Sequence, residues 1–215
     1  MCSSFSIRIM KPTPTVVSLP QPALSHHAAQ YTRVAMFLHW SVALLMIANV
    51  VLGLTASRLP EGTLSGDMLR LLIDTHKSIG ITVLALSIVR VIWRATHRPP
   101  PLPSVMPGWE RVFAHAVHGG LYALIFLLPL SGWAHDSAWV AAASHPMYLF
   151  GIVPWPRIGV IMSLAPDLKE SLHAWFGTLH TACGYALYAL LGLHVLGALK
   201  HHWIDRHPVL SRMLP

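Results

Sequence analysis

The chain has 215 residues, of which 54% are hydrophobic and only 11% are charged. A soluble globular domain usually carries about a quarter charged residues, so this composition excludes an ordinary soluble enzyme and indicates a membrane protein. The net charge of +7 would suggest nucleic acid for a soluble chain. In a membrane protein it indicates cytoplasmic loops and contact with anionic lipid, so no nucleic-acid partner is expected.

Residues 1–30 contain scattered Pro, Ser and His and no apolar run of signal-peptide length, so they are expected to form a disordered tail before one domain at 31–215. Four apolar segments follow, each long enough to span a bilayer. The sequence therefore predicts an all-α, transmembrane four-helix bundle. Its expected helices cover about 34–56, 75–93, 111–134 and 172–199, and the longest loop, 135–169, is expected to form a short surface helix or lid.

The placement of Lys and Arg predicts the orientation of these helices. Most of the fifteen Lys and Arg residues lie in the N-terminal tail, the second connector and the C-terminal tail, or at the adjoining helix ends. Cytoplasmic loops are enriched in these residues. Four spans should therefore run with both termini in the cytoplasm.

The fourth apolar segment carries His180 and His194, fourteen residues apart. On an α-helix this separation is about 21 Å, and the two side chains point within about 40° of each other. Both imidazoles therefore lie on one face of one helix at two depths, which suits two stacked cofactors. For either histidine alone, a helix–helix hydrogen bond is an equally good interpretation.

The predicted topology places the other histidines by depth. His39 begins the first helix at the cytoplasmic level of His194, and His76 begins the second helix at the outer level of His180. Each pair would bring two neutral imidazoles together from two helices, as bis-histidine ligation of a haem iron requires. A bare metal is less favoured, because bundle metal sites usually add carboxylates or cysteines and these spans hold no Asp or Glu away from their ends.

Two further histidines leave alternatives open. His118 is also at the cytoplasmic level, where it could replace His39 or His194 as a ligand or contact a haem propionate. His173 lies seven residues before His180, on nearly the same face of the helix. As the outer ligand it would separate the two irons by about 30 Å, which is long for a bilayer core.

Three basic residues are candidates for contacts beyond the iron ligands. Arg33 and Arg90 could pair with haem propionates or serve only as cytoplasmic anchors of their helices. Lys77 directly follows His76 and could neutralise a propionate or snorkel to the membrane interface. It could also steer an anionic substrate towards the outer cofactor.

Four stretches together carry a resemblance to a known family. The chain resembles the bacterial cytochrome b561 family, four-helix dihaem membrane proteins, over nearly everything after residue 30. The matching stretches are FLHW (Phe37–Trp40), THKSIGITVLALSIVRVIWR (Thr75–Arg94), AHAVHGGLYALIFLLPLSGW (Ala114–Trp133) and HTACGYALYALLGLHVLGALKHHWIDRHPVLSRMLP (His180–Pro215). Two features depart from the family: the long N-terminal extension, and the segment HAWFGTLH with two candidate outer histidines.

The resemblance implies that His39, His76, His180 and His194 ligate the irons of two non-covalent haems b. It also implies a place in the bacterial inner membrane and electron exchange with ubiquinone. One branch of the family oxidises superoxide and passes the electron to ubiquinone, so a superoxide:ubiquinone oxidoreductase is the expected function. The alternatives are a haem subunit that serves a partner dehydrogenase and, in another class, a histidine-based metal-ion transporter.

Overall fold

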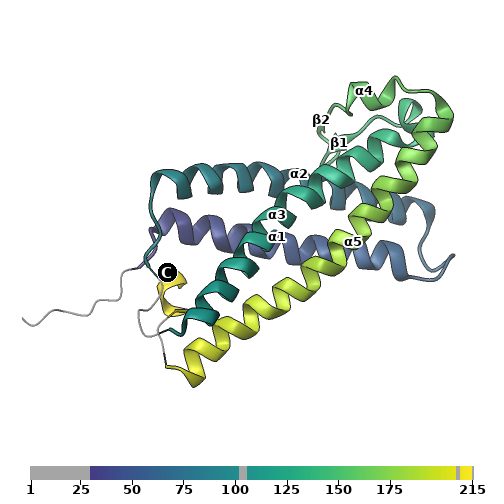
Figure 1. Cartoon of the computed structure of the whole chain (residues 1–215). Helices are drawn as coiled ribbons and strands as arrows, with labels where there is room; N and C mark the ends of the chain where they lie inside the picture. The colour runs from purple at the N-terminus through teal and green to yellow at the C-terminus, as the bar shows by residue number, and fades with distance from the viewer. Residues whose placement is uncertain (1–29, 102–105, 207–208, 215) are drawn as a thin grey trace, which may run out of the picture.

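The computed structural model describes residues 30–101, 106–206 and 209–214, and the expected tail 1–30 lies outside them apart from Gln30. Four long helices dominate: α1 (Arg33–Arg58), α2 (Gly66–Thr96), α3 (Gly108–Ala138) and α5 (Pro166–Leu199). Figure 1 also contains the short elements η1 (Val140–Ser144), β1 (Tyr148–Leu149), β2 (Val153–Pro154), α4 (Gly159–Met162), η2 (Lys200–Ile204) and η3 (Ser211–Met213). The expected all-α four-helix bundle is confirmed.

Two helices begin well before their apolar segments. At the start of α2, Ser65 Oγ accepts the backbone N–H of Met68 at 3.3 Å, the usual role of a serine cap. At the start of α5, Pro166 occupies the first turn, where its missing N–H costs nothing. These N-terminal signals, rather than hydropathy, determine where the two helices begin. α2 and α5 are therefore longer than the expected 75–93 and 172–199.

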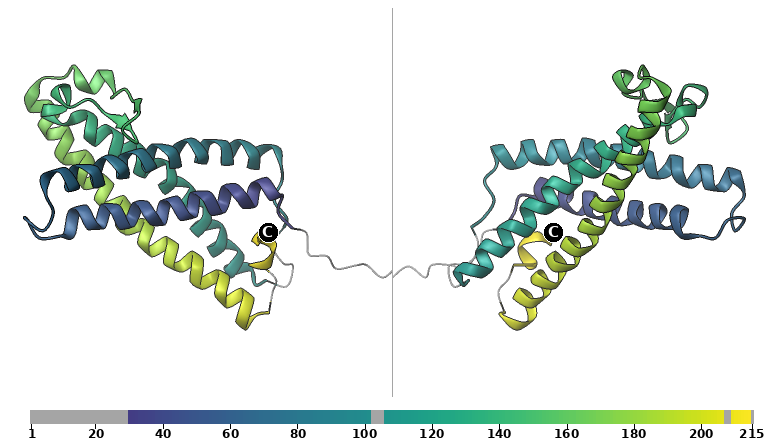
Figure 2. Two further views of the ribbon diagram at one scale, coloured as in Figure 1. Left: turned by 180° about the vertical axis from the view of Figure 1, so that it is seen from behind. Right: turned by 45° about the vertical axis from the view of Figure 1, so that its right-hand side comes forward.

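The bundle consists of two helix pairs that cross each other. α1 packs along α2 and α3 packs along α5, and the two pairs cross obliquely in all views (Figures 1 and 2). The core forms where they meet and contains Val42, Met46, Val83, Leu124, Leu128, Cys183 and Leu187. Since α1 and α5 belong to different pairs, side chains from these two helices can face each other across the bundle.

Both ends of the described chain meet at one end of the bundle, here called the terminal end. The backbone N–H of Tyr31 donates to Arg212 O at 3.3 Å, and Trp40 Nε1 donates to Met213 O at 2.8 Å. The segment 139–165, here called the outer loop, lies at the opposite or loop end (Figure 2). An even number of crossings thus returns the chain to the side where it began.

The surface of the four long helices is apolar. All four are long and apolar enough to cross a membrane. Large apolar side chains are exposed along their lengths, for example Phe37, Leu44, Ile92 and Leu196. Such contiguous apolar exposure fits lipid rather than water as the surrounding solvent. The protein is therefore a multi-pass membrane protein.

Candidate functional site

Two histidines from different helices face each other near the loop end. The imidazoles of His76 on α2 and His180 on α5 have ring centres 6.0 Å apart and an angle of 80° between ring planes. With a metal–nitrogen bond of about 2.0 Å, two imidazoles on opposite sides of one metal ion have ring centres about 6 Å apart. The separation of this pair therefore suits two axial ligands of one iron.

Backbone carbonyl groups fix the orientation of both rings. His76 Nδ1 lies 3.0 Å from Asn49 O, and His180 Nδ1 lies 3.0 Å from Leu128 O and 3.1 Å from Ser131 Oγ. A carbonyl oxygen can only accept, so each neutral ring carries its proton on Nδ1. The other nitrogen, Nε2, then keeps a lone pair. This is the tautomer in which a histidine binds a metal through Nε2.

Glycines on two neighbouring helices make room for these rings. A β-carbon on Gly53 of α1 would come within 3.0 Å of His76 Cε1. A β-carbon on Gly132 of α3 would come within 3.2 Å of His180 Cε1. Both distances are tighter than ordinary carbon–carbon contacts. The ring positions therefore depend on glycine at these two sites.

A cavity of about 760 Å³ surrounds the His76–His180 pair. Its volume falls in the range of sites that bury a drug-sized or cofactor-sized ligand. Most of the lining is apolar, and all four long helices also contribute polar groups to it. Besides the two histidines, the polar and charged lining residues are Asn49, Ser57, Arg58, Lys77, His135, Asp136, His173, Thr181, Tyr185 and Tyr188.

The second predicted pair lies near the terminal end. His39 on α1 and His194 on α5 have ring centres 6.2 Å apart with an angle of 65° between ring planes. His118 on α3 is also close, with its ring centre 5.1 Å from that of His194. Three imidazoles therefore meet at this level, and the alternative that involves His118 has to be judged on packing.

Packing favours His39 over His118 as the partner of His194. α3 and α5 are in close contact one turn from these histidines, where a β-carbon on Gly120 would lie 2.6 Å from Leu190 Cδ1. A flat macrocycle has no room between two helices that touch this closely. α1 and α5 belong to different helix pairs, so the space between His39 and His194 is the better one.

Arg90 is the predicted propionate contact that lies nearest to these rings. Its guanidinium donates to His39 Nδ1 at 2.9 Å and to Tyr122 Oη at 3.2 Å. Because a guanidinium only donates, His39 accepts at Nδ1 here, unlike the two histidines of the loop-end pair. Ligation of a metal through His39 Nε2 would require this arginine to release Nδ1. Arg33, the other candidate, is exposed in the first turn of α1.

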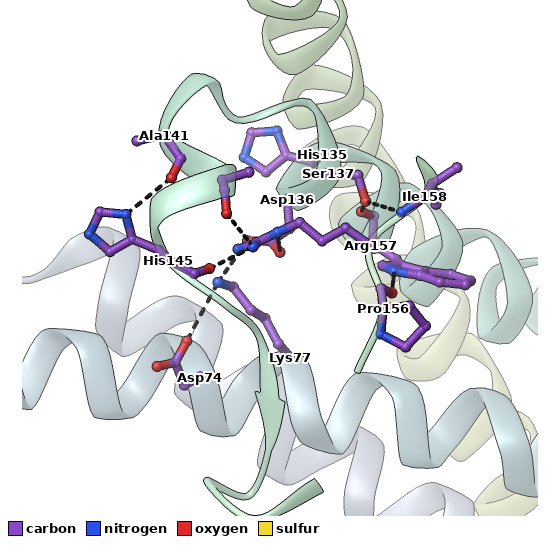
Figure 3. Close-up of polar contacts among 12 residues, drawn as sticks. Asp74, Lys77, His135, Asp136, Ser137, Ala141, His145, Pro156, Arg157 and Ile158 are labelled. Atoms are coloured by element: carbon purple, nitrogen blue, oxygen red, sulfur yellow. Dashed lines mark hydrogen bonds and ion pairs between the residues drawn. The ribbon is translucent and has the colours of Figure 1, made fainter. Parts of the chain in front are cut away.

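Lys77 occupies an ion-pair network rather than open space. Its ammonium lies 2.7 Å from Asp136 Oδ1 and 3.5 Å from Asp74 Oδ1. Figure 3 draws these residues together with Arg157. Arg157 of the outer loop binds the other oxygen of Asp136 at 2.8 Å. The positive charge of Lys77 is therefore largely compensated within the protein. This weakens the expectation that Lys77 steers an anion, since a paired charge projects little field.

His173 contacts a histidine that the sequence analysis did not single out. The rings of His135 and His173 stack with centres 3.8 Å apart. Each donates its Nδ1 proton to the backbone carbonyl of the other residue, at 2.8 and 2.9 Å. His173 thus lies beside α3 and pairs with His135, whereas His180 is the residue that faces His76.

Arg58 is a further site residue that sequence reasoning missed. It lines the large cavity from the last turn of α1, and it donates to Tyr185 Oη at 2.8 Å. Within the described part of the chain, no carboxylate forms an ion pair with Arg58. The sequence did contain a signal for Arg58. It lies in the last turn of a span, on the side of the membrane where fewer basic residues are expected, so an arginine there is unusual.

A charged cluster lies at the terminal end, beyond the histidine pair. Lys200 in η2 contacts Glu110 at 2.6 Å and Asp205 at 2.9 Å, and His201 Nδ1 lies 2.7 Å from Asp205 Oδ2. These contacts hold the pKa of the Asp205 carboxyl below its ordinary value, mainly through the hydrogen bond from Lys200. The cluster joins the start of α3 to the end of α5 and fixes that end of the bundle.

The fold and these pairs define a class of protein: a multi-pass membrane bundle whose facing helices present paired imidazoles inside it. Comparison with known proteins agrees. Residues 30–215 match the family described as prokaryotic cytochrome b561. The chain therefore belongs to the prokaryotic cytochrome b561 family, which confirms the resemblance of the four stretches. It is a membrane haem protein, and the family implies haem of the b type.

Individual relatives show how similar this chain is to named proteins. It is 34% identical over 142 residues to cytochrome b561 homolog 2 of Escherichia coli K12, across 66% of this chain and 69% of that protein. It is 24% identical over 186 residues to cytochrome b561 homolog 1 of the same bacterium, across 86% and 97%. It is 28% identical over 148 residues to a Yersinia pestis protein named probable superoxide oxidase CybB, across 65% and 73%.

Proposed function

We propose that the chain binds two haems b, one near each end of the bundle. His76 and His180 would hold the haem near the loop end, and His39 and His194 the haem near the terminal end. The observation that carries this proposal is the separation of about 6 Å between ring centres in both pairs. The glycines Gly53 and Gly132 support it for the loop end, because they leave room for the two rings.

Residues around each pair would tune the site. At the loop end, the hydrogen bonds from Nδ1 to backbone carbonyls make both imidazoles more basic ligands and keep their rings in place. Arg90, which lies against His39, is the best candidate to bind a propionate at the terminal end. Bound haem supplies reversible one-electron chemistry at its iron.

We further propose a place in the bacterial inner membrane with the terminal end in the cytoplasm. The basic residues Arg33, Arg90, Arg94, Arg111 and Arg212 lie at that end, in agreement with the excess of Lys and Arg on the cytoplasmic side. The loop end would then face outwards. Two haems at the two ends would allow electrons to pass between the two sides of the membrane.

The proposed activity is superoxide:ubiquinone oxidoreduction. One superoxide gives dioxygen and one electron, and two such electrons with two protons reduce one ubiquinone to ubiquinol. The similarity to the Yersinia pestis protein named probable superoxide oxidase supports this reaction. The guanidinium of Arg58 lines the loop-end cavity and forms no ion pair with a carboxylate among the described residues, which supports an anionic donor because an unpaired positive charge raises the local concentration of anions.

Rapid mixing of the purified protein with superoxide would test the proposed activity. In lipid nanodiscs that contain ubiquinone, we expect superoxide to reduce the haem, which the change in its absorbance bands reports. Ubiquinol should accumulate at one molecule per two superoxide anions. Haem that is reduced by ubiquinol but not by superoxide would reject the donor. It would favour the alternative of a haem subunit that receives electrons from a partner dehydrogenase.

A further inference from the structure

The outer loop carries almost no charge for a segment outside the membrane core. Arg157 is the one Asp, Glu, Lys or Arg residue in 139–165. Its side chain is 8% exposed and turns inwards, where it binds Asp136 and the backbone carbonyls of Ala142 and His145 (Figure 3). The outward surface of the loop therefore has none of these four residue types, whereas water-exposed segments usually contain many of them.

Apolar side chains cover that outward surface instead. Ile152 is 79% exposed and Val160 is 75% exposed, and three further residues of the hairpin between β1 and β2 are at least two-fifths exposed. Those three are Tyr148, Phe150 and Val153. Exposed apolar residues that cluster in this way mark a surface that contacts something other than water.

The tip of the hairpin carries a phenylalanine, Phe150, where a turn exposed to water usually has a small polar residue. Leu149 O accepts the N–H of Ile152 at 3.0 Å, and the two residues between them, Phe150 and Gly151, have φ values of 52° and 72°. Turns with positive φ at both central positions favour Asn-Gly or Asp-Gly. A bulky residue at positive φ is uncommon. An exposed phenylalanine at this position makes sense if its ring lies in an apolar medium.

The hairpin lies against the side of a membrane-spanning helix. The backbone N–H of Phe150 donates to Ser78 Oγ at 2.9 Å, and Ser78 is fully buried on α2. Ser78 is about 18 Å along α2 from Gly66, so the hairpin flanks the helix rather than covering its end (Figure 1). Leu71, seven residues before Ser78 and on nearly the same side of α2, is also apolar and exposed, and the exposed ion pair of Arg70 and Asp74 lies beside it.

We propose that the hairpin Tyr148–Pro154 enters the membrane surface at the loop end, with Phe150 and Ile152 among the lipid headgroups and upper acyl chains. The occupant of this surface is thus the lipid of the leaflet on that side. The hairpin packs against Ser78, about three turns into a helix that is apolar enough to cross a membrane, and the hairpin itself presents no charge that lipid would have to desolvate.

This contact would also keep in place the outer-loop residues that line the loop-end cavity. Trp139 and Met147 from the outer loop line the cavity that contains His76 and His180. With the hairpin held by lipid and by Ser78, and Arg157 of the outer loop held by Asp136, these two side chains would stay in the cavity lining. The proposal stands on the exposed surface and does not depend on which electron donor the protein uses.

Spin labels on the full-length protein in phospholipid vesicles would test the proposal. The parent carries Cys2→Ser, and its remaining Cys183 is buried. Labels are placed singly at Ile152→Cys and at Val160→Cys, with Glu61→Cys in the exposed turn between α1 and α2 as the water control and Leu196→Cys, exposed on α5, as the lipid control. Power saturation then compares collisions with oxygen, which partitions into lipid, and with a water-soluble nickel chelate.

We expect the Ile152 label to resemble the Leu196 label, with at least a threefold higher ratio of oxygen to nickel accessibility than the Glu61 label. The Val160 label provides a second position if the first variant does not retain the haem spectrum of the parent. An accessibility ratio equal to that at Glu61 at both positions would overturn the proposal. It would mean that this surface stays in water in the absence of any partner, as a docking site for a soluble protein does.

Discussion

His76 and His180, on helices α2 and α5, hold their ring centres 6.0 Å apart, and each ring contacts a backbone carbonyl through Nδ1. Two features of this relationship are chemically specific. The separation suits one iron between two nitrogens, and the hydrogen bonds leave Nε2 of both rings unprotonated. Helix packing alone needs neither feature. The relationship therefore leads to predictions that distinguish a cofactor site from ordinary packing.

Removal of either member of a pair should remove the same haem. We expect His76→Ala and His180→Ala each to lower the content from two haems per chain to one, because a haem with one axial histidine is held weakly. His39→Ala and His194→Ala should remove the other haem. Haem content by the pyridine haemochrome method and low-temperature EPR identify which signal is lost in each variant.

Two nearby histidines provide matched controls for these variants. His173→Ala and His118→Ala should each retain both haems, since His173 pairs with His135 and His118 lies between helices in close contact. Loss of the loop-end haem from His173→Ala with retention in His180→Ala would show that the ligand on α5 lies two turns earlier. Loss of the terminal-end haem from His118→Ala with retention in His39→Ala would show that His118, not His39, is the partner of His194.

Alanine at two glycines should weaken the loop-end site without unfolding the protein. In Gly53→Ala and Gly132→Ala the new β-carbon would lie 3.0 and 3.2 Å from a histidine ring, so the ring must shift. We expect haem to transfer to apomyoglobin about tenfold faster or more, as for other changes beside metal ligands. Gly192→Ala is the control, because its β-carbon would have no neighbour within 4 Å. Equal transfer rates in all three variants would contradict the assignment.

Asp136 should hold the outer loop to the bundle. Asp136→Asn removes the carboxylate that pairs with both Lys77 and Arg157 and leaves two cations without it. We expect the free energy of unfolding to fall by about 3 kcal/mol or more. Asp74→Asn, whose side chain is 46% exposed, should cost less than about 1 kcal/mol. Thermal unfolding and protease cleavage within 139–165 measure the two effects, and similar values for both variants would contradict this role.

Arg58 should accelerate the reaction with an anionic donor. We expect Arg58→Gln to slow haem reduction by superoxide about tenfold at low ionic strength, because attraction of an anion to the cavity is lost. Added salt should slow the unmodified protein more than the variant. Arg58→Lys, which keeps the charge, should restore most of the rate. If the haem potential changes while the rate and its salt dependence stay the same, Arg58 acts as a propionate contact instead.

Much of this arrangement follows from the sequence because it depends on helical geometry. The separation of His180 and His194 fixes their shared face and their two depths, and an apolar span fixes which end of the bundle each occupies. His39 does lie opposite His194, and His76 opposite His180. That these residues ligate iron stays a prediction, because ring geometry alone does not identify the bound group.

Contacts at the helix ends could not be predicted in the same way. Asp136 was expected in a loop, whereas α3 continues to Ala138 and brings this carboxylate to Lys77. The partner of His173 depends on the same extension, because His135 is reached only when α3 and α5 run past their apolar segments. Hydropathy defines the part of a helix inside the membrane, but caps and tertiary contacts decide where the helix stops.

The number of haems per chain tests the central claim most directly. The purified protein in nanodiscs is assayed for haem by the pyridine haemochrome method and for chain by amino-acid analysis, and its oxidised EPR spectrum is recorded. The account predicts two haems b per chain and two low-spin signals, one from each histidine pair. One haem per chain, or a high-spin signal from a saturated preparation, would contradict two bis-histidine sites.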